Sequence, residues 1–597
     1  MNKNEVDYVY RLSQELAQLR ADLEKAEHLH FEVTGKSLRA LLKSDAASTE
    51  STKEATPPLA IGAAAFATES IPSCLEPTLL LQIQTLNQSK APALKSNPTN
   101  YRLGQYPLTD EQQNGVDLAA TGESLKVEAG AGSGKTSSLT AISHNLGKKK
   151  GLYLAFNQSV IRDAKGRFHP NTDCRTTHSV AFGFVGKLYA DRIQKKNLSS
   201  KIIVAALGLE DWNNISKWGQ ANVIRQWVIN FAQSDLPVLS NKVAPWRAIK
   251  MLTKQGDRQM AYEESKPIAA YLGPLASMLW EMLQDVHGTL PIWPDVYLKV
   301  WALTNPQLHT NYILLDEAQD TAKVILKLIQ DQESQVIWVG DRRQQIYAWR
   351  GAVNAMETIV TPHTCQLTRS FRYGQPIADL ANKVLENFLG EPSFRIVGSP
   401  MVESRLCEVE NPKMILCRGN RGAMKELMEA LRLKKRVHMA GDVSTMIAEV
   451  ESCVSIMAGR RPRLPDFQMF NTWNEVLEYS ETEAGSELQT LVKLLKLWPA
   501  AELLQALSAV QEVKQEDADV TISTAHKAKG LESPSVRLAD DFSFPPSDLG
   551  RPDMPYSEEE ARILYVALTR AQHELDISQC RAAHVALQWS GSPANTS

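Results

Sequence analysis

Two short strings contain residues whose types and spacing fit nucleotide chemistry. Residues 129–136 read AGAGSGKT, and residues 316–320 read DEAQD. Glycines let backbone N–H groups approach phosphate oxygens, and the lysine and threonine that follow add a cation and a hydroxyl ligand for Mg²⁺. The acidic string supplies one carboxylate for a metal ion and a second for an attacking water molecule. In this order on one chain, the two strings predict ATP hydrolysis.

The glycine loop lies between an apolar strand expected at 124–128 and a helix expected from Thr136 onward. A phosphate loop needs this context, because the helix N-terminus adds partial positive charge to the backbone cradle. Lys135 would neutralise the β- and γ-phosphates, and Thr136 would ligate Mg²⁺. The cradle itself would be formed by Ala129, Gly130, Ala131, Gly132, Ser133 and Gly134. The alternative interpretation is a glycine-rich turn that binds no ligand.

The acidic string follows the apolar run YILL at 312–315, which is typical of a buried strand. At the end of that strand, Asp316 is expected to serve the metal site. Glu317 beside it can polarise the attacking water. The alternative is an acidic strand-to-helix turn whose aspartate caps the next helix. The phosphate loop upstream favours the catalytic interpretation.

A third string, VGDRRQQIYAWRGA at 339–352, combines polar and aromatic residues after another apolar strand. Gln344 is expected near the strand ends, where a nucleotide would lie. Trp349 beside Arg350 offers a flat face and a cation, and aromatic faces stack on bases irrespective of sequence. A tryptophan buried in the core is the alternative for Trp349.

Apolar strands alternate with helical patterns from Tyr101 onward, and such alternation indicates parallel sheets covered on both faces. Two series of strands imply two α/β cores, at 101–360 and 361–597. Helical insertions are expected at about 185–300 and about 445–515. The expected strands are 124–128, 151–155, 312–315 and 335–339 in the first core, and 413–417, 519–523, 535–539 and 574–578 in the second.

The first hundred residues follow a different pattern. Apolar residues at heptad spacing predict a helix over 5–33, which either forms a short coiled coil or packs on its own protein. Residues 1–43 are therefore expected to form an N-terminal helical extension, which could serve a protein partner or self-association. Residues 44–100 begin with a polar, Ser/Thr/Pro-rich stretch and are expected to be a linker.

The composition of the chain limits the classes of protein to which it can belong. The chain has 597 residues, a net charge of −3 and 43% hydrophobic residues, so a nucleic-acid surface would have to be local. None of the seven cysteines forms a CxxC pair, which argues against zinc ribbons and iron–sulfur clusters. With no apolar run long enough to span a membrane, the chain is expected to be cytoplasmic, and nucleoid-associated if bacterial. Seven of the twelve tryptophans lie between Trp212 and Trp301, where they are expected to build a helical core.

Together these strings resemble the superfamily 1 helicases of the UvrD/Rep type. The likeness is greatest to the helicase core of the F-box DNA helicase subgroup, although no F-box is apparent. It rests on YLAFNQSVIRDAKGRF (153–168), GDRRQQIYAWRGAVNA (340–355), SFRYG (370–374), AHKAKGLE (525–532) and EEEARILYVALTRA (558–571), and it covers about residues 105–580. The resemblance implies two RecA-like motor domains, with ATP and Mg²⁺ bound between them.

The resemblance also implies roles for residues at matching positions. Gln112 would read adenine, Phe371 would stack on it, and Glu532 would contact the ribose. Gln344 would sense the γ-phosphate. Two arginines from the second core, Arg372 and Arg570, would contact the γ-phosphate as arginine fingers.

The path of single-stranded DNA is implied in the same way, through Phe156, His178 and Trp349. The resulting hypothesis is an ATP-dependent DNA helicase or single-strand translocase, 3′→5′ by resemblance, that acts on single-stranded and tailed duplex DNA. A second hypothesis is the motor subunit of a helicase–nuclease complex with a separate nuclease, since few residues follow Arg570. A third is an ATP-gated nucleic-acid-binding adapter. Lys135, Glu317 and Arg570 argue against an inactive enzyme.

Overall fold

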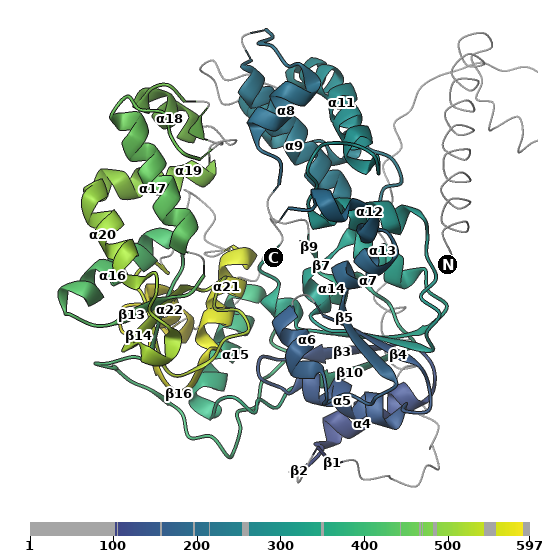
Figure 1. The fold of residues 1–597 in the computed structure, drawn as a ribbon. Coiled ribbons are helices and arrows are strands. Elements are labelled where there is room, and N and C mark those ends of the chain that lie inside the picture. The colour runs from purple at the N-terminus through teal and green to yellow at the C-terminus, as the bar shows by residue number, and fades with distance from the viewer. Residues whose placement is uncertain are drawn as a thin grey trace, which may run out of the picture. The chain divides into compact units, whose positions relative to one another are not determined.

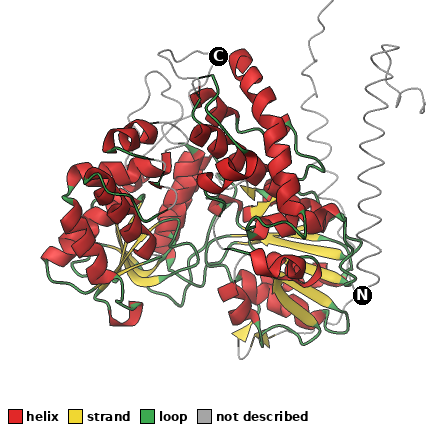
Figure 2. Ribbon diagram, turned by 45° about the horizontal axis from the view of Figure 1, so that its top comes forward, coloured by secondary structure: helices red, strands yellow, loops and turns green. Residues whose placement is uncertain are grey.

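The computed structural model describes residues 102–103, 106–155, 158–194, 197–213, 215–252, 262–347, 352–441, 443–464, 467–468, 470–481, 486–542 and 557–588. The predicted N-terminal helix and linker lie outside these residues. So do Phe156 and Trp349, two of the three residues expected along the DNA path. Within the described residues the chain is α/β, with two parallel sheets and helices on both faces of each (Figures 1 and 2).

The first sheet has six parallel strands in the order β10-β3-β8-β6-β4-β5. Its inner strands are buried runs with few polar residues, as expected for a sheet covered on both faces. The strands are β3 (Leu125–Ala129), β4 (Gly151–Ala155), β5 (Thr172–Thr176), β6 (Tyr312–Leu315), β8 (Gln335–Gly340) and β10 (His363–Leu367). Because β10 pairs with β3 over five residues, the first sheet extends past residue 360.

Two layers of helices cover this sheet. One face carries α4 (Asp110–Ala120), α5 (Lys135–Asn145) and α6 (Gln158–Ala164), whose apolar residues share one buried cluster with the sheet. The other face carries α7 (Thr177–Phe184), α13 (Lys323–Gln330) and α14 (Ala355–Thr358). The carboxyl ends of the strands stay free of these layers, and parallel sheets bind their ligands at that edge.

A helical insertion extends the second of these faces. It contains the 3₁₀ helix η1 (Gly186–Arg192) and the helices α8 (Ser200–Leu207), α9 (Lys217–Gln233), α10 (Trp246–Leu252), α11 (Tyr262–Gln284) and α12 (Pro294–Leu303). Figure 1 shows α8, α9 and α11 grouped beyond α12. Trp227, Trp280, Trp293 and Trp301 are at most 6% exposed. These tryptophans build the insertion's core, as the sequence predicted.

The second sheet also has six parallel strands, in the order β11-β16-β15-β12-β14-β13. One face is covered by α15 (Gln375–Leu389), α21 (Glu558–Leu568) and α22 (Arg581–Gln588). The strands are β11 (Arg405–Leu406), β12 (Met414–Cys417), β13 (Val437–Met439), β14 (Val520–Thr524), β15 (Ser533–Leu538) and β16 (Ala571–Asp576).

A second group of helices packs on the opposite face of this sheet. It consists of α16 (Asn420–Arg432), α17 (Val443–Met457), α18 (Trp473–Ser480), α19 (Ser486–Leu497) and α20 (Ala500–Val510). No helix among the described residues is both long enough and apolar enough to cross a membrane.

Candidate active site

The glycine loop joins β3 to α5 at the carboxyl edge of the first sheet. Gly132 and Gly134 adopt positive φ angles of 75° and 78°, a backbone region that costs glycine no steric strain. A Cβ atom at Gly132 would lie 2.6 Å from Ser370 Oγ, and one at Gly134 would lie 3.0 Å from Gln112 Nε2. At these two positions the loop therefore has room for backbone atoms but not for a side chain, as a phosphate cradle requires.

Ser133 adds a second sign of a cradle. Its Oγ is buried and has no hydrogen-bond partner among the residues that the structure describes. Buried polar atoms are rarely left without a partner, and one at a loop of this shape fits a missing phosphate oxygen. The residues present therefore fit a nucleotide triphosphate.

Gln112 and Phe371 lie at the far end of this loop, although 259 positions separate them in sequence. Gln112 belongs to a capping box: its backbone N–H donates to Thr109 Oγ1 over 3.2 Å, and Thr109 N–H donates to Gln112 Oε1 over 3.1 Å. Gln112 Nε2 therefore points toward Gly134. Phe371 N–H donates to Gly132 O over 2.8 Å, and its ring is 47% exposed beside Gly134. An exposed ring and a free amide group at this position can hold a base.

Lys135 and the acidic string meet at the other end of the loop. Lys135 Nζ lies 3.3 Å from Glu317 Oε1. Burial lowers the pKa of Lys135, but the carboxylates of Glu317, Asp341 and Asp316 outweigh burial, so its pKa is raised. Lys135 is therefore a fixed cation at physiological pH. Thr136 follows it, half-buried, in the first turn of α5.

The pKa values of the two acidic residues are shifted in opposite directions. Burial and the neighbouring Glu317 raise the pKa of Asp316 to about 6. Burial alone would raise the pKa of Glu317 too, but Lys135 and Lys529 hold it low. Glu317 also has a positive φ of 53°, a strained backbone for a residue with a side chain. Contacts with Lys135 and Gln319 hold this carboxylate at the end of β6 as an anion that can orient water.

Two side chains that the sequence did not single out hold these carboxylates, and a third residue, Asp341, supports one of the two. Tyr153 Oη donates to Asp316 Oδ2 over 2.8 Å, and Gln319 Nε2 donates to Glu317 Oε2. Gln319 Oε1 in turn accepts from Asp341 N–H over 3.1 Å. Gln319 and Asp341 lie inside the quoted strings and could have been noticed there. Tyr153 also opens a quoted string, but the string alone does not indicate its contact with Asp316, which is 163 positions away.

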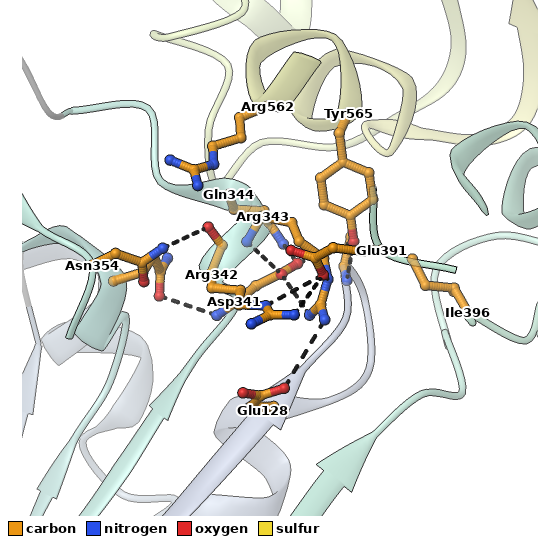
Figure 3. Close-up of polar contacts among 12 residues, drawn as sticks. Glu128, Asp341, Arg342, Arg343, Gln344, Asn354, Glu391, Ile396, Arg562 and Tyr565 are labelled. Carbon is orange, nitrogen blue, oxygen red and sulfur yellow. Dashed lines mark hydrogen bonds and ion pairs between the residues drawn. The ribbon is translucent and has the colours of Figure 1, made fainter. Parts of the chain in front are cut away.

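Asp341 is the central acceptor of this network (Figure 3). Its carboxylate is completely buried and accepts from Gln344 Nε2 over 2.7 Å and from Tyr565 Oη over 3.0 Å. Tyr565 comes from α21 of the second core, and its hydroxyl also accepts from Ala131 N–H of the glycine loop over 3.1 Å. One carboxylate thus links the phosphate loop, the predicted sensor Gln344 and the second core.

The two predicted arginine fingers stand on the second core's side. Arg570 is 2% exposed and donates to Val566 O over 2.9 Å and to Gln344 Oε1 over 3.4 Å. Burial and Arg372 lower the pKa of Arg570 to about 9, so it remains charged at pH 7. Arg372 Nε donates to Glu532 Oε2 over 2.6 Å. Glu532 is therefore bound to an arginine finger here.

Lys529 forms another bridge between the cores that the sequence did not predict. It lies in the AHKAKGLE string of the second core. Its ammonium pairs with Asp320 of DEAQD and donates to Gln344 O over 2.6 Å. DEAQD and VGDRRQQIYAWRGA are separate strings in the sequence, whereas in the structure Lys529 contacts a residue of each.

His178 is the one residue of the predicted DNA path that the structure describes. It lies on α7, is about one-third exposed, and its Nε2 is 2.8 Å from Asp295 Oδ1 of α12. Thr177, His178 and Asp295 line a cavity of about 270 Å³ that also reaches Asp316 and Glu317. The predicted DNA contact His178 and the two carboxylates of the acidic string thus line the same cavity.

Comparison with known proteins gives two family matches. Residues 108–360 match the UvrD/REP helicase N-terminal domain, and residues 426–582 match the UvrD-like helicase C-terminal domain. Similar proteins include F-box DNA helicase 1 of Gallus gallus, which is 30% identical over 80% of this chain and 49% of its own length. F-box DNA helicase protein 1 of Schizosaccharomyces pombe is 29% identical over 78% and 57%.

A third similar protein is DNA helicase IV of Escherichia coli, 23% identical over 79% of this chain and 68% of its own length. The chain spans about half the length of the first two relatives. Each of these three alignments covers both α/β cores, because the aligned share of the chain is too large to lie in one core alone.

Proposed function

Because the chain belongs to the UvrD-like helicase family, we propose that it is an ATP-dependent DNA helicase or single-strand translocase. The observation that carries the proposal is the contact between Gln344 of the first core and Arg570 of the second, beside Lys135 and Glu317. A site built from both cores can couple hydrolysis to their relative movement. The names of the relatives, all DNA helicases, support DNA as the track.

The residues present suit each part of ATP. Phe371 and Gln112 would hold the adenine, with Glu532 at the ribose. The glycine loop and Lys135 would hold the phosphates. Mg²⁺, held by Thr136 and Asp316, would neutralise charge on the β- and γ-phosphates; such ions usually bind one or two protein oxygens plus the nucleotide.

Hydrolysis then follows from the charges of the chain's own residues. Glu317, kept anionic by Lys135 and Lys529, orients the attacking water. Gln344, fixed by Asp341, lies beside the γ-phosphate position. Arg372 and Arg570 stabilise the charge that develops there, an effect of about 10³–10⁵ in rate where it has been measured in GTPases.

Movement requires that binding energy differ between two states of the cleft. Arg372 and Arg570 favour the closed state only while a γ-phosphate is present, because that phosphate is their shared partner. After hydrolysis the cores separate, and a strand gripped alternately by the two cores advances. By resemblance the direction is 3′→5′, and the work is strand movement in DNA repair, recombination or replication.

The decisive experiment compares ATP hydrolysis and strand displacement on 3′-tailed, 5′-tailed and blunt duplexes of DNA and of RNA. We expect displacement of 3′-tailed DNA, and no displacement by Glu317→Gln. Displacement of 5′-tailed DNA alone would reverse the polarity. ATP binding without nucleic-acid-stimulated hydrolysis would instead identify an ATP-gated adapter.

A further inference from the structure

A buried ion pair joins the sensor loop of the first core to the end of a helix in the second. Arg343, beside the sensor Gln344, is 1% exposed. Its Nε donates to Glu391 Oε2 over 2.5 Å, and its guanidinium lies over the Phe394 ring, 3.5 Å from the ring centre. Arg342 Nη2 reaches the same carboxylate oxygen over 3.0 Å. Figure 3 shows both arginines converging on Glu391.

This pair does not touch the nucleotide-binding residues directly. Arg343 acts through Asp341: its backbone N–H donates to Asp341 Oδ1 over 3.1 Å, and its Nη1 lies 3.6 Å from the same oxygen. Asp341 in turn holds Gln344 and, through Gln319, Glu317. Arg343 lies against that buried carboxylate, whose hydrogen-bonding side chains are the neutral Gln344 and Tyr565. Loss of the guanidinium would weaken the charge compensation of Asp341, to which Lys135 also contributes.

Glu391 lies in the loop from α15 to β11, and this loop packs on residues 368–374, the segment by which the chain passes from the first core to the second. Glu391 follows α15, which packs in the second core, and Gly390, whose φ is +65°. Three residues later the chain reaches the phosphate loop, since a Cβ on Gly130 would lie 3.3 Å from Ile396 and 3.5 Å from Phe394. Val397 then pairs with the segment that leaves β10, accepting from Ser370 N–H over 2.8 Å.

Connecting segments of this kind form hinges, because they absorb the dihedral changes while the domains rotate as rigid bodies. Relative displacement is smallest near such crossings and largest at the outer edges of the cleft. A buried contact at the crossing can therefore persist through opening and closing. Contacts such as that of Arg372 lie at the moving face.

We propose that Arg343 and Glu391 are positioning residues at the hinge, which hold Asp341, and through it Gln344 and Glu317, in register with the phosphate loop while the cores rotate. The inference rests on the proposed motor function and deepens it. It predicts a defect in turnover and coupling rather than in nucleotide binding. ATP binding is spared because neither residue lies at the glycine loop, Gln112 or Phe371.

The test is Glu391→Gln in the full chain, measured by steady-state ATP hydrolysis with saturating single-stranded DNA. Loss of one charge-assisted contact of this kind corresponds to about a tenfold effect. We expect kcat to fall about tenfold with KM for ATP within about twofold, and the ATP consumed per strand displaced to rise. Glu574→Gln is the matched control, because Glu574 pairs with the exposed Arg405 at the second sheet, and it should change none of these values.

Arg343→Lys guards against a folding defect in the first variant. Lysine keeps the cation but loses the planar fork and the stacking on Phe394, so we expect a smaller fall in kcat, about threefold, at unchanged KM. Near-wild-type kcat and ATP cost in both folded variants would overturn the proposal, as would a parallel rise in KM and fall in kcat that tracked lost stability. A wild-type chain without DNA-stimulated hydrolysis would instead overturn the proposed function.

Discussion

Lys135 and Lys299 are two buried lysines of the first core, one at the nucleotide site and one in the helical insertion. Carboxylates surround Lys135 and raise its pKa. Lys299, 1% exposed, donates to Ser234 O over 2.6 Å and Leu236 O over 2.7 Å at the end of α9, and burial lowers its pKa to about 8. In the insertion, neutral backbone carbonyls accept the hydrogen bonds of the buried Lys299 ammonium group. The nucleotide site instead gathers charges of both signs around Lys135.

The sharpest test of this contrast is Lys135→Met against Lys299→Met. Lys135 is expected to contact the phosphates directly, so its removal should lower kcat/KM for ATP by at least ~10³-fold. Lys299→Met should leave kcat/KM within about twofold and act on stability alone. Steady-state hydrolysis and urea unfolding of both variants provide the measurements. Comparable losses of activity would remove the distinction between the two regions.

Glu317→Gln removes a negative charge from the same site. The substitution keeps the volume and the bond from Gln319 but removes the charge that orients water. We expect kcat to fall by about 10²–10³ while the ATP dissociation constant stays within about threefold. Asp331→Asn, at the exposed pair with Lys327 on α13, is the control. Retained turnover in Glu317→Gln would exclude this residue as the water-orienting base.

Tyr153→Phe tests the support beneath the metal site with a smaller change. Its hydroxyl fixes one oxygen of Asp316, and loss of such supporting bonds typically costs 10–100-fold in metal affinity. We expect the Mg²⁺ concentration for half-maximal hydrolysis to rise about tenfold, with kcat at saturating Mg²⁺ nearly unchanged. The contradicting result would be an unchanged Mg²⁺ requirement. Tyr312→Phe, which removes the hydroxyl bonded to Thr172 on β5, on the far side of β4, controls for the general cost of such a change.

The smallest effect is the pH dependence that Lys299 adds to stability. Its pKa is about 8 in the folded chain, against an ordinary value of 10.5. Unfolding therefore takes up a proton between these pH values, and the free energy of unfolding rises with pH across that window. Relative to Lys299→Met, the wild type should gain on the order of 2 kcal/mol from pH 8 to 10.5. A flat difference in chemical denaturation would show instead that the pKa of Lys299 in the folded chain stays close to its ordinary value of 10.5.

Much of the fold was predictable because buried parallel strands appear in the sequence as apolar runs. All eight predicted strands are present, shifted by at most three residues. The strands not predicted include β5 and β10, which alternate buried and exposed residues at the two edges of the first sheet and contain few apolar residues. Edge strands are half-exposed, so their sequences resemble loops.

The residues of the candidate site were predictable only in part. Its reactive residues come in short strings, and the structure brings Lys135, Glu317, Gln344 and Arg570 together as those strings implied. The supporting residues were not predictable in the same way. Tyr153 meets Asp316 across 163 positions, and Lys529 meets Asp320 across 209. Such pairs depend on the order of strands in the sheet, which no local pattern contains.

The position of β10 determines how this chain could be divided into fragments. β10 covers one side of β3, the strand that leads into the glycine loop, and pairs with it from His363 to Leu367. A first-core fragment that stopped at residue 360 would leave β3 as an open edge with a row of unpaired backbone groups. Such a fragment would recruit strands from other copies and aggregate. Split versions for complementation assays or selective isotope labelling therefore need the cut after Leu367.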